Sequence, residues 1–180
     1  MGVRVAHTAE LTAWERAELR EFLDGAFAGR FSDEDFEHCL GGLHVLAREG
    51  ADGALVAHGS VVQRRASLGE RALRVGYVEA VAVRADRRRL GWGGRVMGRL
   101  ERVVDGGYEL GALSASAAGA GLYAARGWWV WPGEVGVLGP RGPERLPEEE
   151  GSTWVWAPAG TFRPGPVGRL SFDWRDGDVL

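Results

Sequence analysis

The residues best suited to chemistry form a short turn in the middle of the chain, Arg88-Arg89-Leu90-Gly91-Trp92-Gly93-Gly94. The turn follows one predicted strand and opens a predicted helix. Glycines let the backbone come close to a bound anion, and the first N–H groups of a helix point outward at the positive end of its dipole. The pattern therefore predicts a binding site for a pyrophosphate group.

Two common phosphate-binding motifs do not fit this turn. A P-loop continues into Gly-Lys-Ser or Gly-Lys-Thr, which is not found here. A dinucleotide-binding loop needs a third glycine three residues beyond Gly93, and position 96 is a valine. A glycine-rich helix start with its arginines in solvent remains the alternative to an anion site.

A carboxylate and a phenol are the side chains best suited to move protons. Glu79 and Ala80 interrupt an otherwise regular strand pattern, and such a break indicates a β-bulge. Tyr123 lies in a predicted helix of small residues that Gly127 ends. Its reference pKa of about 10 suits an acid that protonates a leaving group of similar pKa. The alternatives are a surface acid at Glu79 and a core tyrosine that anchors its helix.

The elements that must position these residues follow from hydrophobic spacing. The pattern predicts strands at 3–7, 43–47, 54–63, 73–83, 110–113, 128–131, 135–138 and 153–157, and helices at 11–27, 91–104 and 117–125. Ser32 and Asp35 resemble a capping box that opens one more short helix. Residues 139–147 are expected to form a loop. We expect a single α/β domain over residues 1–180, with the loop-rich tail 158–180 docked on it.

The spacing Arg88-x-x-Gly91-x-Gly93 after a bulged strand resembles the acetyl-CoA pyrophosphate loop of the GNAT acetyltransferases. This resemblance implies the GNAT fold, a central mixed and mostly antiparallel sheet flanked by helices. It also implies acetyl-CoA as cosubstrate, with the backbone of Val81, Ala82 and Val83 along the pantetheine arm. Tyr123 matches the tyrosine that protonates the departing CoA thiolate in that family.

Longer blocks resemble the aminoglycoside 2′-N-acetyltransferases nearly from end to end. The blocks are residues 25–29, 36–44, 76–80, 108–116 and 173–180. The resemblance implies an antibiotic-resistance enzyme in which Glu79 is the base, directly or through ordered water. Substrate contacts are then expected at Arg30, Asp35, Glu79, Ala80, Ser114, Glu148, Glu149, Asp178 and the terminal carboxylate of Leu180.

Two positions depart from that family. Arg30 stands where the family usually has aspartate, and Leu180 stands where it usually ends in tryptophan. A cation at position 30 is expected to repel one substrate amine unless its side chain turns into solvent. We therefore expect a substrate range shifted from that of the usual family members.

Composition limits the other classes of function. The 180 residues carry a net charge of -3, which does not favour nucleic-acid binding. With no signal peptide and no long apolar run, we expect a cytoplasmic protein without a membrane partner. Cys39, the single cysteine, is interpreted as a small buried residue rather than a reactive thiol. The histidines and the cysteine lack the spacing of zinc ligands, so no metal is expected. A homodimer is considered possible.

Two other functions remain open from the sequence. The chain could acetylate another amine, such as an amino sugar, a polyamine or a protein N-terminus. It could also be an acetyl-CoA-binding protein that has lost turnover. Retention of both Glu79 and Tyr123 favours an enzyme, and the acidic residues near the C-terminus favour a polycationic substrate.

Overall fold

A computed structural model describes residues 2–50, 53–158 and 168–180. The chain divides into two compact units. Unit 1 contains Met1–Val62 and Val78–Arg102, and unit 2 contains Gln63–Tyr77 and Val103–Leu180. Strands β3 (Leu55–Leu68) and β4 (Arg71–Val83) each contribute residues to both units. The single domain expected over residues 1–180 stays a prediction.

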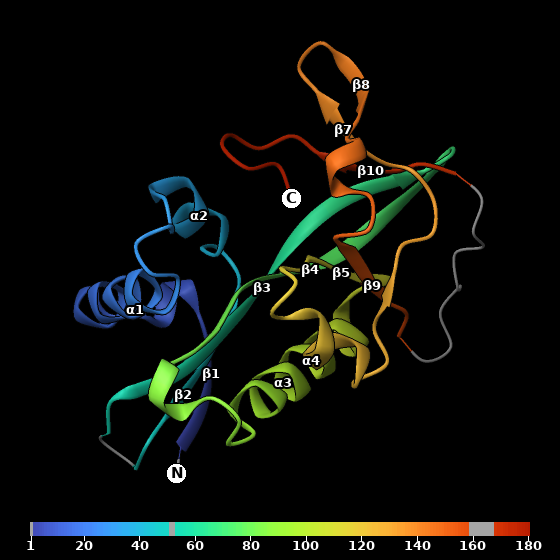
Figure 1. Cartoon of the computed structure of the whole chain (residues 1–180). Helices are drawn as coiled ribbons and strands as arrows, with labels where there is room; N and C mark the ends of the chain where they lie inside the picture. Colours follow the sequence, from blue (N-terminus) through green and yellow to red (C-terminus); the bar gives the residue numbers. More distant parts are fainter. Residues whose placement is uncertain (1, 51–52, 159–167) are drawn as a thin grey trace. The chain divides into compact units, whose positions relative to one another are not determined.

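Unit 1 is a sheet with helices on both faces. Its other elements are β1 (Gly2–His7), η1 (Thr8–Glu10), α1 (Ala13–Ala26), α2 (Asp33–His38), β2 (Leu43–Arg48), η2 (Ala85–Arg87) and the first part of α3 (Trp92–Gly107). β1 pairs antiparallel with β2, β2 pairs antiparallel with β3, and β4 follows. Helices α1 and α2 cover one face, and α3 covers the other (Figure 1).

Side-chain caps set where two of these helices begin. The Ser32 hydroxyl accepts the Asp35 N–H at 3.0 Å, and the Asp35 carboxylate accepts the Ser32 N–H at 2.8 Å. The predicted capping box is therefore confirmed. Thr12 and Glu15 cap α1 in the same way. Leu19 and Leu23 form the buried face of α1, whereas Trp14 is 67% exposed.

Alternation along β3 decides which side chains meet which helix. A Cβ at Gly59 would lie 2.9 Å from Val96 and Leu100 of α3, so helix and strand are in close contact there. The neighbours of Gly59 therefore point to the opposite face, which α1 and α2 cover. On that face Cys39 and Leu23 pack with Ala82 in one apolar cluster.

Unit 2 is a mixed sheet in the order β6-β9-β5-β4-β3-β10-β7-β8. Its own elements are β5 (Leu110–Ser114), α4 (Ala120–Ala124), β6 (Trp129–Val130), β7 (Val135–Gly139), β8 (Gly142–Arg145), η3 (Pro147–Glu149), β9 (Thr153–Trp156) and β10 (Leu170–Asp173). The β4–β5 and β7–β10 pairs are parallel, and the β5–β9, β6–β9, β7–β8 and β3–β10 pairs are antiparallel. The predicted mixed, mostly antiparallel sheet flanked by helices is confirmed.

Most boundaries differ from the sequence prediction by a few residues, and three differences concern β3, β8 and α4. β8 forms inside residues 139–147, which were expected to be a loop, because Pro143 is tolerated on a strand at the edge of the sheet. β3 runs five residues further than predicted, to Leu68, and pairs there with β10. α4 is shorter than expected. Among the described residues, no helix is long and apolar enough to cross a membrane.

Candidate active site

The predicted anion-binding turn contains two residues in the left-handed region of backbone conformation. Arg89 has φ +63° and Gly91 has φ +82°, so two left-handed residues lie on either side of Leu90. The Arg95 N–H then bonds to the Gly91 carbonyl at 3.1 Å, and this bond begins α3. The first N–H groups of a helix have no partner within the helix. The start of α3 can therefore offer N–H groups to an anion.

The arginines around this turn divide into paired and exposed side chains. Arg87 is paired with Glu49 at 2.9 Å and with Asp86 at 2.9 Å. The Arg88 guanidinium donates to the backbone carbonyl of Val83 at 3.3 Å. Arg89 is exposed, and its side chain has no recorded partner among the described residues. Arg89 is therefore the cation with the most freedom to meet a bound anion.

The predicted break in β4 coincides with a left-handed residue. Ala80 has φ +49°, an uncommon conformation for a residue with a side chain. Glu79 is half-buried next to it. Burial and, to a smaller extent, the charge of the nearby Glu79 carboxylate together raise the pKa of the Cys39 thiol to about 12. Cys39 is fully buried, which confirms its predicted place in the core.

Tyr123 lies in unit 2 and is 7% exposed. Its ring centroid is 6.3 Å from the ring centroids of Trp128 and of Trp154. Burial raises the pKa of Tyr123 to about 12. The phenol is therefore fully protonated at neutral pH and available as a proton donor.

The acids of the late loop have different partners. Glu149 accepts the Ser114 hydroxyl at 3.2 Å and the Ser152 hydroxyl at 2.8 Å, so these predicted site residues do meet. Arg145 holds Glu150 at 2.8 Å and lowers the pKa of its carboxyl. Glu148 is exposed and has no recorded ion pair in the described part of the chain.

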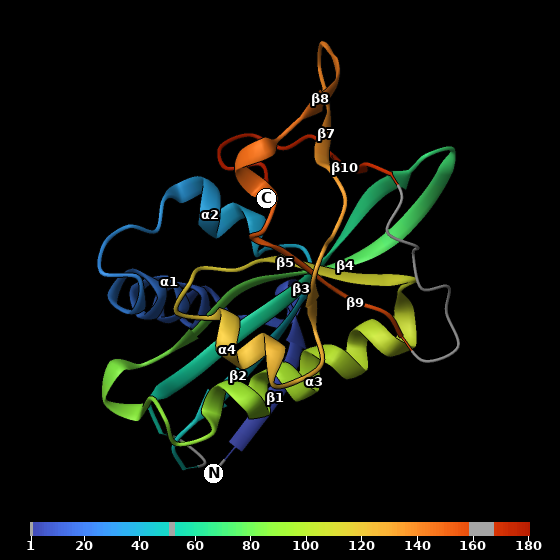
Figure 2. The same ribbon diagram turned by 45° about the vertical axis from the view of Figure 1, so that its right-hand side comes forward.

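The C-terminal segment is fixed by a buried arginine, Arg64. Its guanidinium donates to the Val179 carbonyl at 2.7 Å and to the Asp173 carboxylate at 2.9 Å. Leu180 is buried, and Asp178 is exposed. Within unit 2 the C-terminus lies beside η3, which carries Glu148 and Glu149 (Figures 1 and 2). The predicted acids of the late loop and the tail therefore gather in one region of this unit.

The two predicted substrate residues near α2 have different surroundings. Asp35 uses one carboxylate oxygen in its helix cap. Arg30 follows the left-handed pair Ala28 and Gly29 and is exposed. Its guanidinium has no recorded partner among the residues that the structure describes. Arg30 can therefore point into solvent.

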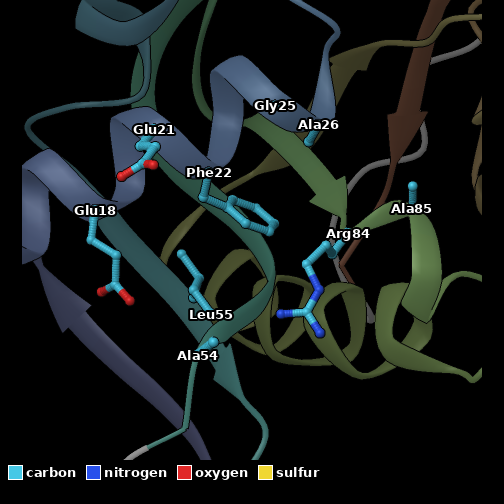
Figure 3. Close-up of a pocket in the computed structure, with 9 residues that line it drawn as sticks. All are labelled: Glu18, Glu21, Phe22, Gly25, Ala26, Ala54, Leu55, Arg84 and Ala85. Atoms are coloured by element: carbon cyan, nitrogen blue, oxygen red, sulfur yellow. The ribbon is translucent and has the colours of Figure 1, made fainter.

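A cavity of about 430 Å³ opens elsewhere in unit 1. Phe22 of α1 and Leu55 of β3 form its apolar floor, and Arg84 closes one side (Figure 3). Arg84 is already bonded to Asp86, and Glu18 is bonded to Arg48. Since none of the predicted site residues is among the described residues that line it, we assign no ligand to this cavity.

Sequence reasoning missed several residues that support these sites. Ser152 holds Glu149, and Arg64 holds the C-terminal segment. Arg64 was missed because the predicted strand ended at residue 63, although alternation continues to residue 66. The contact between His44 and His58 depends on the register between β2 and β3, which the sequence pattern does not reveal.

Comparison with known proteins defines the class to which this chain belongs. A family model described as an acetyltransferase (GNAT) domain matches residues 8–131. The chain belongs to the GNAT acetyltransferases, enzymes that use acetyl-CoA, and the predicted family, enzyme class and cosubstrate are confirmed. An aminoglycoside 2′-N-acetyltransferase from Mycolicibacterium fortuitum is 46% identical over 179 residues, which cover 98% of this chain and 90% of that protein.

Solved structures support the fold. The GNAT acetyltransferase YhbS from Escherichia coli, in complex with CoA, aligns with a TM-score of 0.66 at 16% identity, covering 95% of this chain and 88% of that one. A GNAT acetyltransferase from Brucella melitensis, in complex with acetyl-CoA, aligns with a TM-score of 0.59 at 17% identity and covers 94% of each chain. Identities this low support the fold alone.

Proposed function

We propose that this chain transfers the acetyl group of acetyl-CoA to the 2′-amino group of an aminoglycoside antibiotic and so confers resistance. The observation that carries the proposal is the 46% identity, along 98% of the chain, to a protein named for this reaction. The acidic residues near η3 and the C-terminus support it, because an aminoglycoside carries several ammonium groups.

Glu79 is the proposed base. The substrate ammonium must lose a proton before its nitrogen can attack, and Glu79 accepts that proton directly or through water. The neutral nitrogen then forms a bond to the thioester carbon. The Val81 N–H donates to the carbonyl oxygen as negative charge develops on it.

Tyr123 is the proposed acid. As the carbonyl re-forms, the attacking nitrogen releases its second proton to water, the carbon–sulfur bond breaks and the sulfur leaves with its electron pair. Tyr123 donates its phenolic proton to that thiolate and regains a proton from solvent. Burial raises the pKa of Tyr123 to about 12, above the reference value of about 10 used for the sequence prediction, so the phenol is a weaker acid than expected and gives up its proton only once the sulfur carries negative charge.

The remaining proposed residues bind acetyl-CoA or the substrate. The N–H groups at the start of α3 and the arginines Arg88 and Arg89 hold the pyrophosphate, and the backbone of Val81–Val83 lies along the pantetheine arm. The proposed substrate contacts are Arg30, Asp35, Glu79, Ala80, Ser114, Glu148, Glu149, Asp178 and the carboxylate of Leu180. A cytoplasmic location and a homodimer stay predictions from the sequence.

One assay tests the proposal. Release of CoA is measured with two aminoglycosides that differ only in a 2′-amino against a 2′-hydroxyl group, and with a polyamine and a peptide N-terminus. We expect turnover of the 2′-amino compound alone. Equal turnover of the 2′-hydroxyl compound would place the reaction on another amine, and turnover confined to the polyamine or the peptide would replace the proposed substrate.

A further inference from the structure

Two buried histidines of unit 1, His44 on β2 and His58 on β3, form a hydrogen-bonded pair. Both are 0% exposed, and His44 Nδ1 lies 3.0 Å from His58 Nε2. His44 is opposite Ser60 in the strand register, so His58 is its diagonal neighbour on the same face. Burial lowers the pKa of His44 to about 4 and that of His58 to about 3. Both rings are therefore neutral at pH 7.

The pair continues into the backbone at both ends. His58 Nδ1 lies 3.0 Å from the Ala80 carbonyl oxygen. His44 Nε2 lies 2.7 Å from the Thr8 hydroxyl, which also accepts the Gly41 N–H at 2.8 Å. The contacts run in order through Gly41, Thr8, His44, His58 and Ala80.

Only one direction of donation satisfies this chain of neutral groups. The Ala80 carbonyl can only accept, so the single ring proton of His58 must be on Nδ1. His58 Nε2 then accepts, which places the proton of His44 on its Nδ1. His44 Nε2 accepts in turn from the Thr8 hydroxyl. Every contact of the chain is then a donor–acceptor pair, with the single Thr8 hydroxyl proton directed to His44 at 2.7 Å rather than to the Gly42 carbonyl at 3.3 Å, and the chain points from Gly41 toward Ala80.

The chain ends on the peptide unit that the reaction is proposed to use. The Ala80 carbonyl and the Val81 N–H belong to one planar trans peptide, so they point in opposite directions. A hydrogen bond that fixes the carbonyl therefore also fixes the direction of the Val81 N–H. It also polarises the peptide, which makes that N–H a stronger donor.

A second contact fixes the preceding peptide. The Ser60 hydroxyl lies 3.5 Å from the Glu79 carbonyl oxygen, and Ser60 shares its face of β3 with His58. Consecutive carbonyls of a regular strand point toward opposite neighbouring strands, yet those of Glu79 and Ala80 both meet side chains of β3. The left-handed Ala80 explains the difference. The peptides on both sides of Ala80 are thus tied to β3.

We propose that His44 and His58 are positioning residues for acetyl transfer, which hold the Ala80 peptide so that the Val81 N–H and the Glu79 carboxylate keep their reactive orientation. The inference rests on the roles given above to Val81 and Glu79. The chain does not act as a proton relay, because it ends on a carbonyl that has no proton to pass on.

Nitrogen-15 NMR of the histidine rings tests the direction of the chain. At pH 7 we expect His44 and His58 to be neutral and to carry their protons on Nδ1. Loss of each signal in His44→Gln and His58→Asn assigns the two rings. A proton on Nε2 of either ring, or a charged ring, would overturn the inference even if the variants were too unstable for kinetics.

Kinetics test the positioning role. His58→Leu removes the donor to Ala80 and should lower kcat about 10- to 100-fold, with little change in the KM for the aminoglycoside. His58→Asn places an amide N–H near the position of Nδ1 and should recover most of that rate. Thr8→Val weakens the chain at its partly exposed end and should cause a smaller loss of kcat.

Val45→Ala is the matched structural control, because Val45 is fully buried next to His44 on β2 and takes no part in the chain. It should lower Tm without lowering kcat. The inference is wrong if folded His58→Leu keeps the wild-type kcat. It is equally wrong if Val45→Ala, at a similar Tm, loses as much kcat as His58→Leu.

Experiments can refute the positioning role of the histidines and the proposed function independently of one another. If the wild-type enzyme acetylates no aminoglycoside, the proposed function fails, and the inference is tested through the affinities for acetyl-CoA and CoA measured by calorimetry. The Val81 N–H meets the acetyl oxygen, which CoA lacks. His58→Leu should therefore weaken acetyl-CoA binding severalfold more than CoA binding. Equal weakening of both would overturn the inference.

Discussion

Glu79 and Tyr123 are surrounded differently, and the difference limits what each side chain can do. Glu79 is half-buried on a backbone that two β3 side chains hold, so water can reach it while its backbone stays fixed. Tyr123 is buried among tryptophans, and its raised pKa opposes ionisation. A base that exchanges protons with solvent and an acid that holds its proton suit the two ends of one acyl transfer.

Glu79→Gln should lower kcat about 100-fold, because the amide cannot accept the ammonium proton. The affinity for acetyl-CoA, measured by calorimetry, should stay the same. The variant should recover activity as pH rises, since free amine then forms in solution. Glu34→Gln, at an exposed acid of α2, is the control. A wild-type kcat at pH 7 in Glu79→Gln would remove this residue from the mechanism.

Tyr123→Phe should lower kcat about 10- to 100-fold, because water must then protonate the thiolate. The ring and its contacts with Trp128 and Trp154 remain, so Tm should change little. Tyr108→Phe makes the same change at a half-buried tyrosine to which no role is given. Steady-state CoA release compares the two variants, and equal rates for them would mean that Tyr123 only anchors its helix.

Arg30→Asp should lower the KM for polycationic aminoglycosides, because it replaces a cation with an anion at an exposed position. The improvement should shrink as the salt concentration rises, since exposed charges are screened. A substrate with a single amine serves as the control and should respond least. An unchanged KM at low salt would mean that the Arg30 side chain points into solvent and takes no part in selection.

At the scale of elements, features that depend on neighbouring residues were predicted well, whereas contacts between residues distant in the sequence were not. The Ser32 cap, the start of α3 and the break at Ala80 depend on neighbouring residues, and all three were predicted. β8 was missed because its Pro143 reads as a loop residue until the edge position of the strand is known. The bond from His58 to Ala80 joins residues 22 apart, and only the sheet brings them together.

The same reasoning explains how much of the site could be predicted. The glycines and arginines of residues 88–94 are adjacent, so their spacing is visible in the sequence. The bond between Ser114 and Glu149 spans 35 positions, and family resemblance rather than spacing predicted those residues. Arg64 reaches Val179 across 115 positions, so its role became visible only in the folded chain.

Gly91→Ala tests the loop as an element. The left-handed φ of Gly91 makes an added Cβ cost about 1–2 kcal/mol, although no atom lies within 4 Å of it. Tm and acetyl-CoA affinity should therefore both fall. Gly106→Ala, the same change within α3, should raise Tm because alanine favours helix. Unchanged acetyl-CoA affinity in Gly91→Ala would show that the turn does not bind the pyrophosphate.

At the scale of the whole molecule, two sets of titrating groups determine how acid affects stability. Arginines and backbone N–H groups lower the pKa of four exposed or half-buried carboxyls, Glu15, Asp86, Glu109 and Glu150. These interactions stabilise the folded protein at neutral pH. Their contribution is lost only as pH falls below the ordinary carboxyl pKa values near 4. His44 and His58, whose pKa values are lowered mainly by burial, act at higher pH.

The wild-type protein should therefore lose stability between pH 6.5 and pH 5, before the carboxyls titrate. In the unfolded chain both histidines take up protons below about pH 6.5, whereas in the folded chain they stay neutral until about pH 4 and about pH 3. The unfolded state then binds more protons, so the free energy of unfolding falls as pH falls. At pH 5, each histidine should lower the free energy of unfolding by up to about 2 kcal/mol.

Urea unfolding at pH 7 and at pH 5 measures this loss. The double variant His44→Gln/His58→Asn is less stable at pH 7, but its stability should differ much less between the two pH values, because the groups that titrate are gone. Val45→Ala should keep the full wild-type difference while being destabilised at both. Equal wild-type stability at pH 7 and pH 5 would mean that the folded protein accepts a proton on this pair. The one-directional hydrogen-bond chain from Gly41 to Ala80 would then be wrong, since a charged ring donates from both nitrogens.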